Sequence, residues 1–170
     1  IKTVGLIINS YKEQIVQIGL RLIALLRQQQ VEVVAIGTEA EALQLTPCTE
    51  DEFCSRSQLV LVIGGDGTML RAARTVYGRE IPILGINQGY LGFLTEIETD
   101  KLQESLQQLL QGDYDIERRM MLTAKVYRDG ACIADVNALN DMVVTKGALS
   151  RIIKLELLLD NQLVERYHGD

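Results

Sequence analysis

The chain has 170 residues, of which 47% are hydrophobic and 24% are charged, a composition typical of a folded globular protein. Its 17 basic and 23 acidic residues leave a net charge of −6. With no Lys/Arg cluster, this charge argues against a sequence-independent nucleic-acid surface but not against bound nucleotides. The longest apolar runs have only the length of a strand, so no membrane span is expected.

The first 112 residues alternate between strand patterns and helix patterns. Strands are predicted over residues 3–8, 31–36, 59–63 and 81–86, and helices over 11–29, 39–45, 69–77 and 100–111, with a loop over 46–57. Thr68 is expected to cap the third helix, and Thr99 or Asp100 the fourth, which Gly112 ends. Such alternation indicates βαβ units on a parallel sheet.

The pattern changes after residue 113, where no further helix is predicted. Residues 121–128 and 131–136 are typical of a hairpin around Asp129-Gly130. Further strands are predicted over 139–146, 152–159 and 163–168, the last two joined by a turn at Asp160-Asn161. The fold class is therefore α/β: a Rossmann-like parallel-sheet domain over 1–113, then the start of an antiparallel all-β domain over 114–170, within which the chain stops.

Cysteine usage and the N-terminus indicate a cytoplasmic protein. Cys48, Cys54 and Cys132 form no CxxC pair and fit a reducing compartment better than a disulfide framework. Only one histidine accompanies them, so no Cys/His zinc site is expected. The first residues lack the layout of a signal peptide, and the missing initiator Met indicates that the numbering begins inside a longer gene product.

The most informative segment is Gly-Gly-Asp-Gly-Thr at residues 64–68, directly after an apolar strand. Its glycines allow close approach of a ligand, and the following helix N-terminus favours an anion. The loop is not of the Walker type, and Leu70 stands where the dinucleotide fingerprint has its third glycine. Asp66 would repel a pyrophosphate, so it suits another task, such as accepting a proton or holding a metal. The alternative is a tight turn with a surface aspartate.

Three other places carry candidate binding groups. Arg71 lies in the first turn of the predicted helix, where a phosphate would explain a cation; the alternative is a solvated arginine. Residues 85–95 (GINQGYLGFLT) combine glycines with Tyr90 and Phe93, which suit a base or ribose, or an inter-domain core. Asn140 and Asp141 could bind ribose hydroxyls, or form a turn at a strand edge.

Taken together, these motifs resemble the NAD kinase family. Gly-Gly-Asp-Gly-Thr also occurs in diacylglycerol and sphingosine kinases and, in related form, in phosphofructokinases. Residues 85–95, however, look nearly letter for letter like the second glycine segment of NAD kinases, and residues 138–141 (ALND) resemble their Asn-Glu motif. Residues 167–170 (YHGD) resemble the start of a later Asp-Gly stretch, and residues 70–74 (LRAAR) resemble the bacterial and cyanobacterial-type members.

The resemblance implies transfer of the terminal phosphoryl group of ATP to the 2′-hydroxyl of the adenosine ribose of NAD, giving NADP. It implies Mg²⁺ or another divalent cation with ATP, polyphosphate as donor in some members, and a homo-oligomer (dimer or tetramer). Asp66 would be the catalytic base, and no residue is expected to be a dedicated metal ligand. The implied nucleotide-binding residues are Gly65, Asp66, Gly67, Thr68, Arg71, Asn87, Phe93, Asn140, Asp141, Arg151, His168 and Asp170.

Two departures from the family pattern limit this expectation. Asp141 is one methylene shorter than the family's Glu, and the family's Thr-Pro-Thr-Gly-Ser-Thr-Ala-Tyr segment is absent. The chain is therefore expected to be an N-terminal fragment that is inactive alone. The alternatives are a lipid kinase, a non-catalytic NAD-binding fragment and, last, a purely structural α/β domain.

Overall fold

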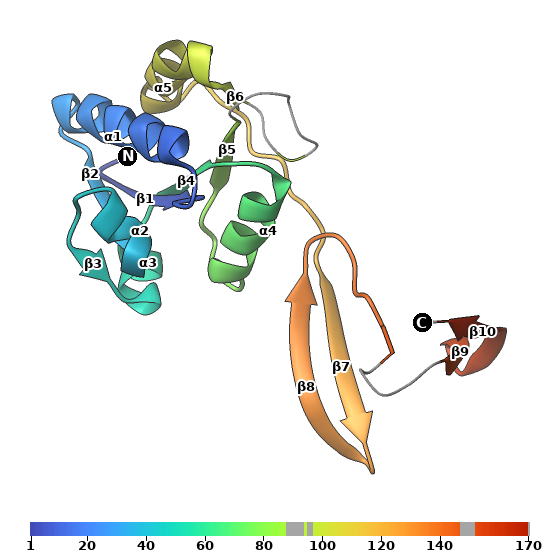
Figure 1. Cartoon of the computed structure of the whole chain (residues 1–170). Coiled ribbons are helices and arrows are strands. Elements are labelled where there is room, and N and C mark those ends of the chain that lie inside the picture. Colours follow the sequence, from blue (N-terminus) through green and yellow to red (C-terminus); the bar gives the residue numbers. More distant parts are fainter. Residues whose placement is uncertain (88–93, 95–96, 147–151, 170) are drawn as a thin grey trace.

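The computed structural model describes residues 1–87, 94, 97–146 and 152–169 (Figure 1). Its central sheet has six parallel strands in the order β3-β2-β1-β4-β5-β6. The strands are β1 (Thr3–Ile8), β2 (Glu32–Ile36), β3 (Pro47–Cys48), β4 (Leu59–Ile63), β5 (Ile83–Asn87) and β6 (Ile97–Glu98). The predicted Rossmann-like α/β class is confirmed.

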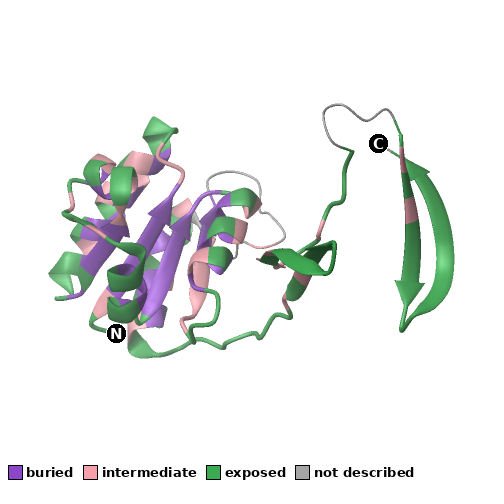
Figure 2. Ribbon diagram, turned by 90° about the horizontal axis from the view of Figure 1, so that it is seen from below, coloured by how far each residue is buried: buried purple, intermediate pink, exposed green. Residues whose placement is uncertain are grey.

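Helices cover both faces of this sheet. They are α1 (Glu13–Gln28), α2 (Gly37–Ala42), α3 (Glu50–Arg56), α4 (Asp66–Thr75) and α5 (Leu102–Gln111), with a 3₁₀ turn at Thr99–Lys101. Side chains of α1, α2 and α5 pack on one face, and those of α3 and α4 on the other. Because alternate residues of a strand point to opposite faces, strands covered on both sides must be apolar throughout. The buried run Leu59–Ile63 meets this requirement (Figure 2).

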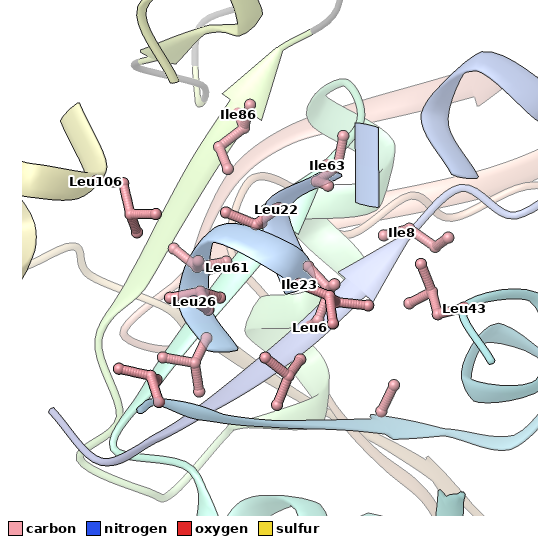
Figure 3. Close-up of a cluster of buried hydrophobic side chains, with 14 of the residues drawn as sticks. Leu6, Ile8, Leu22, Ile23, Leu26, Leu43, Leu61, Ile63, Ile86 and Leu106 are labelled. Atoms are coloured by element: carbon pink, nitrogen blue, oxygen red, sulfur yellow. The ribbon is translucent and has the colours of Figure 1, made fainter. Parts of the chain in front are cut away.

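The larger core cluster lies between α1 and the sheet (Figure 3). Leu22 and Leu26 of α1 pack with Leu6 of β1 and Leu61 of β4, all 1% exposed or less. The spacing of four residues between Leu22 and Leu26 places both on one helix face. This packing anchors β1 and β4, the two central strands, against each other.

The strand order reverses between β1 and β4. From β1 the chain proceeds to β2 on one side, and from β4 it proceeds to β5 on the other. In open α/β sheets the crevice beyond the carboxyl ends of two such strands is the usual ligand site. The loop over residues 64–68 follows β4 and therefore lies at this switch point.

Residues 46–57, predicted as a loop, instead contain β3 and the helix α3, so that prediction is wrong. Thr49 and Glu52 form a reciprocal capping box: the Thr49 N–H donates to Glu52 Oε2 (2.8 Å), and the Glu52 N–H donates to Thr49 Oγ1 (3.2 Å). Phe53 then buries its whole side chain beneath the sheet. The capping box and the buried Phe53 are thus enough to stabilise α3, although its seven residues are too few to show a helical hydrophobic period.

The capping box predicts a pH-dependent contribution to stability. The Thr49 N–H and, second, the Thr49 hydroxyl lower the pKa of Glu52. The contribution is therefore present above the unfolded-state pKa of about 4.3 and disappears as pH falls through the lower folded-state pKa. We expect Glu52→Gln to reduce the free energy of urea unfolding at pH 7, and this difference from wild type to shrink as the pH falls below the unfolded-state pKa. Glu50→Gln in the same turn is the control; a pH-independent difference would contradict the assignment.

Helix ends differ from expectation in α5. Thr99 and Asp100, predicted as alternative caps, lie in the 3₁₀ turn, and the helix begins after Lys101 without a side-chain cap, so both cap predictions are wrong. The 3₁₀ turn occupies the residues at which the caps were expected, directly before the first turn of α5. Gly112 adopts φ +81 and ends the helix as predicted, because this left-handed conformation suits glycine.

Two β-hairpins follow the parallel-sheet region: β7 (Leu122–Arg128) with β8 (Ala131–Ala138), and β9 (Ile153–Leu159) with β10 (Gln162–Gly169). Their turns have left-handed central residues, at Asp129-Gly130 (φ 50, 80) and Asp160-Asn161 (φ 50, 64), as hairpins of two-residue loops prefer. Both hairpins and turns were predicted. Their residues are exposed or half-buried, in contrast to the sheet (Figure 2).

The strand predicted over residues 139–146 is wrong, since this segment has no strand conformation. A strand needs a hydrogen-bonded neighbour, and the described strands offer this segment none. In the described part of the chain, no helix has the length and apolarity required to cross a bilayer.

Candidate functional site

The loop after β4 is fixed in place at its first glycine, Gly64. The Gly64 N–H donates to the Ile86 carbonyl of β5 (3.0 Å), and a Cβ added at Gly64 would lie 2.4 Å from Thr68 Oγ1. Gly64 is thus required by internal packing. The expectation that Thr68 caps α4 is wrong: the helix begins at Asp66 with Gly65 at the cap position, and the Thr68 side chain is buried against Gly64.

Internal packing, which requires glycine at residue 64, does not explain the glycines at residues 65 and 67. A Cβ at either position would meet no atom of the described residues within 4 Å, and neither residue has a positive φ. Both are exposed. Neither packing nor backbone conformation within the described chain demands glycine here. The open space beside their backbone is what close approach of a ligand requires.

Asp66, between these two glycines, is half-buried in the first turn of α4. Its Oδ1 accepts a hydrogen bond from the Leu94 N–H (3.1 Å). Leu94 belongs to the second glycine segment, so this bond joins the two glycine segments at the carboxyl edge of the sheet. A carboxylate at a helix N-terminus is also favourably placed with respect to the helix dipole.

Arg71 lies in the second turn of α4, because the helix begins earlier than predicted; its expected place in the first turn is therefore wrong. Its guanidinium forms an ion pair with Glu39 of α2, and its Nη2 donates to the Ile8 carbonyl at the end of β1 (2.8 Å). The Arg71 side chain remains 45% exposed. It therefore lies across the end of β1, at the switch point, with part of its surface open to solvent.

Asn87, the last residue of β5, is buried at the same sheet edge. The register pairs Ile63 with Ile86, so Asn87 lies beside Gly64. The structure thus gathers Gly65, Asp66 and Gly67 with Arg71 and Asn87 around the ends of β1, β4 and β5.

The remaining predicted site residues lie elsewhere or outside the described residues. Asn140 and Asp141 are exposed just after β8, and His168 is exposed on β10, opposite Lys154 of β9. Phe93, Arg151 and Asp170 lie outside the described residues, as does Tyr90. Local sequence patterns gave no signal for Glu39, whose partner Arg71 is 32 residues away.

A cavity of about 970 Å³ lies beside α4. Its wall includes Met69 and Ala73 of α4, Val76 just after that helix, the start of β5, and residues of the connection 114–119. Leu94 lines this cavity, while its N–H binds Asp66. The cavity is thus a largely apolar space along α4, and none of residues 64–68 lines it.

Strand order, the glycine loop and an acidic residue at the switch point define this chain as a Rossmann-like α/β protein with a candidate ligand site at the carboxyl edge of its sheet. Comparison with known sequences narrows the class, because the family described as ATP-NAD kinase N-terminal domain matches residues 4–114. The chain belongs to the NAD kinase family. The predicted family is thereby confirmed.

Individual relatives of this chain are also named NAD kinase. The NAD kinase of Natranaerobius thermophilus is 39% identical over 176 residues, which cover 99% of this chain and 60% of the relative. That of Moorella thermoacetica is 42% identical over 171 residues, 98% of this chain and 54% of the relative. The chain thus spans 60% or less of the length of these two curated relatives.

Solved structures show the same fold. Yeast NADH kinase, solved with NADH, superposes with a TM-score of 0.87 at 19% identity, covering 98% of this chain and 55% of that one. An NAD kinase from Archaeoglobus fulgidus, solved with ATP, gives 0.71 at 23% identity, covering 99% and 58%. At these identities the likeness concerns the fold.

Proposed function

We propose that the protein to which this chain belongs transfers the terminal phosphoryl group of ATP to the 2′-hydroxyl of the adenosine ribose of NAD, forming NADP. The observation that carries the proposal is Asp66 at the switch point, between two glycines that nothing in the described chain requires. Membership of the NAD kinase family supports the choice of substrates.

Asp66 is the proposed general base. Its carboxylate accepts the proton of the 2′-hydroxyl as that oxygen attacks the terminal phosphorus, and the bond from this phosphorus to the bridging oxygen breaks, so that ADP leaves. The Leu94 N–H, bound to Oδ1, fixes the carboxylate, and an ionised carboxylate can accept several hydrogen bonds at once. The Asp66 carboxylate thus has the fixed orientation that a general base needs in order to accept a proton from the substrate.

The phosphates are proposed to lie against the open backbone of Gly65 and Gly67, at the N-terminus of α4. Amide groups and the helix dipole there favour an anion. Arg71 adds a fixed positive charge beside the end of β1. Positioning and neutralisation of charge are the main contributions a protein makes to phosphoryl transfer.

A divalent cation, Mg²⁺ in the simplest case, fits this site as a companion of ATP. The described residues contain no group of three or more His, Cys, Asp or Glu side chains arranged to hold a metal. Mg²⁺ usually keeps water and phosphate oxygens and takes only one or two carboxylates from a protein. When bound, it would offset the negative charge of the phosphates near Asp66.

The remaining residues are proposed to complete the NAD site. Thr68 acts indirectly, by packing against Gly64. The proposed contacts to the nucleotides come from Asn87, Phe93, Asn140, Asp141, Arg151, His168 and Asp170. We further propose a division into domains at residue 113, a homo-oligomer (dimer or tetramer), and a cytoplasmic location without a nucleic-acid or membrane partner.

Competition between substrates tests the function. The full-length protein is offered NAD and a diacylglycerol together with γ-labelled ATP and Mg²⁺, and the label is followed in both products. We expect the label in NADP. Label in the lipid would establish a lipid kinase instead, and calorimetric binding of NAD without any NADP formation would establish a non-catalytic binding protein.

A further inference from the structure

The last residue of β1 lacks a strand neighbour on one side. β1 pairs with β4 through Ile8, but its pairing with β2 stops at Gly5, opposite Val34. The Asn9 N–H bonds to Ile63 of β4 (3.2 Å), and successive residues of a parallel strand bond to opposite neighbours. The N–H and carbonyl of Ile8 therefore face the side that β2 has left.

An ion pair takes the place of the missing strand. The Ile8 N–H donates to Glu39 Oε2 (2.9 Å), Arg71 Nη2 donates to the Ile8 carbonyl (2.8 Å), and Glu39 Oε1 accepts from Arg71 Nη1. The two side chains thus satisfy both backbone groups of a buried residue and bind each other. Buried backbone groups left unpaired are costly, so this arrangement resists rearrangement.

The two members of the pair differ in exposure. The Glu39 side chain is only 14% exposed, whereas that of Arg71 is 45% exposed. Glu39 is thus engaged almost entirely within the protein. Arg71 is held along one edge by Glu39 and Ile8, and its guanidinium carries five N–H donors, more than these two contacts use.

We propose that Glu39 is a positioning residue for substrate binding. It holds the Arg71 guanidinium over the end of β1, so that the remaining donors bind a phosphate group of one of the two nucleotides at the switch point. This inference rests on the proposed function, because it assigns Arg71 a phosphate of ATP or NAD. Preorganisation is the physical gain, since a free arginine side chain would lose its rotamer freedom on binding.

Glu39→Gln is the informative substitution because it keeps the side-chain shape. A carboxylate offers acceptors on both oxygens, while an amide offers an acceptor on one side and a donor on the other. The amide of this variant would therefore direct its NH₂ group either at the Ile8 N–H or at the Arg71 guanidinium. One of the two contacts must fail, which loosens Arg71 either directly or through the Ile8 backbone to which it is also bound.

The test is a double-mutant cycle on steady-state kinetics in the full-length protein. Arg71→Met first identifies which nucleotide, ATP or NAD, shows a KM raised about tenfold or more. We expect Glu39→Gln to raise the KM of the same nucleotide severalfold with kcat nearly unchanged. The double variant should match Arg71→Met alone, because Glu39 acts only through Arg71. Glu41→Gln, which removes an exposed charge from the same helix, should leave both KM values unchanged.

If the wild-type protein forms NADP, three results would overturn the proposal that Glu39 positions Arg71. These are an unchanged KM in Glu39→Gln, a change in the KM of the other nucleotide, or a KM effect of equal size in the presence and absence of Arg71. If Glu39→Gln does not fold, Arg71→Lys replaces it: lysine keeps the charge but cannot span both contacts, so the same KM should rise. Absence of NADP formation by wild type would instead contradict the proposed function.

Discussion

Replacing Asp66 by asparagine is expected to lower kcat at least about 100-fold in the full-length protein, while calorimetric affinity for NAD stays close to wild type. Asparagine has nearly the same shape, and its side-chain oxygen can still accept the Leu94 N–H. What it loses is the ability to take a proton from the ribose hydroxyl. The defect should therefore appear in turnover rather than in binding.

A matched control is available in α3. Asp51 also lies in the first turn of a helix, but its side chain is 94% exposed, with Arg79 nearby at 3.4 Å. Asp51→Asn should leave kcat unchanged. Near-normal turnover in Asp66→Asn would remove Asp66 from the role of base, and an equal loss in both variants would indicate a general effect of charge.

Two glycines of the same loop should respond in opposite ways to alanine. Gly67→Ala is expected to leave the free energy of unfolding unchanged or raise it by up to about 1 kcal/mol, because alanine favours a helix and the new methyl meets no atom of the residues that the structure describes. Its kcat/KM should nevertheless fall by about 100-fold, since the methyl occupies the space proposed for phosphate and misplaces the substrate.

Gly64→Ala should instead destabilise the protein by about 1–3 kcal/mol, because its methyl would lie 2.4 Å from Thr68 Oγ1 and 2.8 Å from Thr68 Cβ. Urea unfolding and steady-state kinetics on both variants separate the two causes. Full activity in Gly67→Ala would show that no ligand approaches this position. Equal destabilisation of both variants would show that Gly67, too, is constrained by packing.

Much of the fold follows from local patterns. The apolar run of β4, buried on both faces, and the apolar face of α1 have periods that admit one interpretation each. The turns at Asp129-Gly130 and Asp160-Asn161 are predictable because few residues tolerate positive φ. Helix α3 carried a readable signal in Thr49 and Glu52, but its seven residues are too few for a periodic pattern.

The candidate site could be predicted only in part from local sequence patterns. Asp66 and its glycines stand out because an acid in a glycine-rich loop after a buried strand has few structural explanations. Glu39 gave no such signal, because its partners Ile8 and Arg71 are 31 and 32 residues away and belong to different elements. The strand expected over residues 139–146 failed for the related reason that pairing depends on a neighbour from another part of the chain.

The order of amino acids alone was enough to establish the family, the parallel sheet and the acid at its carboxyl edge, since each depends on residues close together in the chain. Only the folded arrangement could decide that Gly64 is needed for packing while Gly65 and Gly67 stay open. It also decided that Arg71 lies across the end of β1. Contacts of this kind depend on which distant elements pack together, and no local pattern encodes that choice.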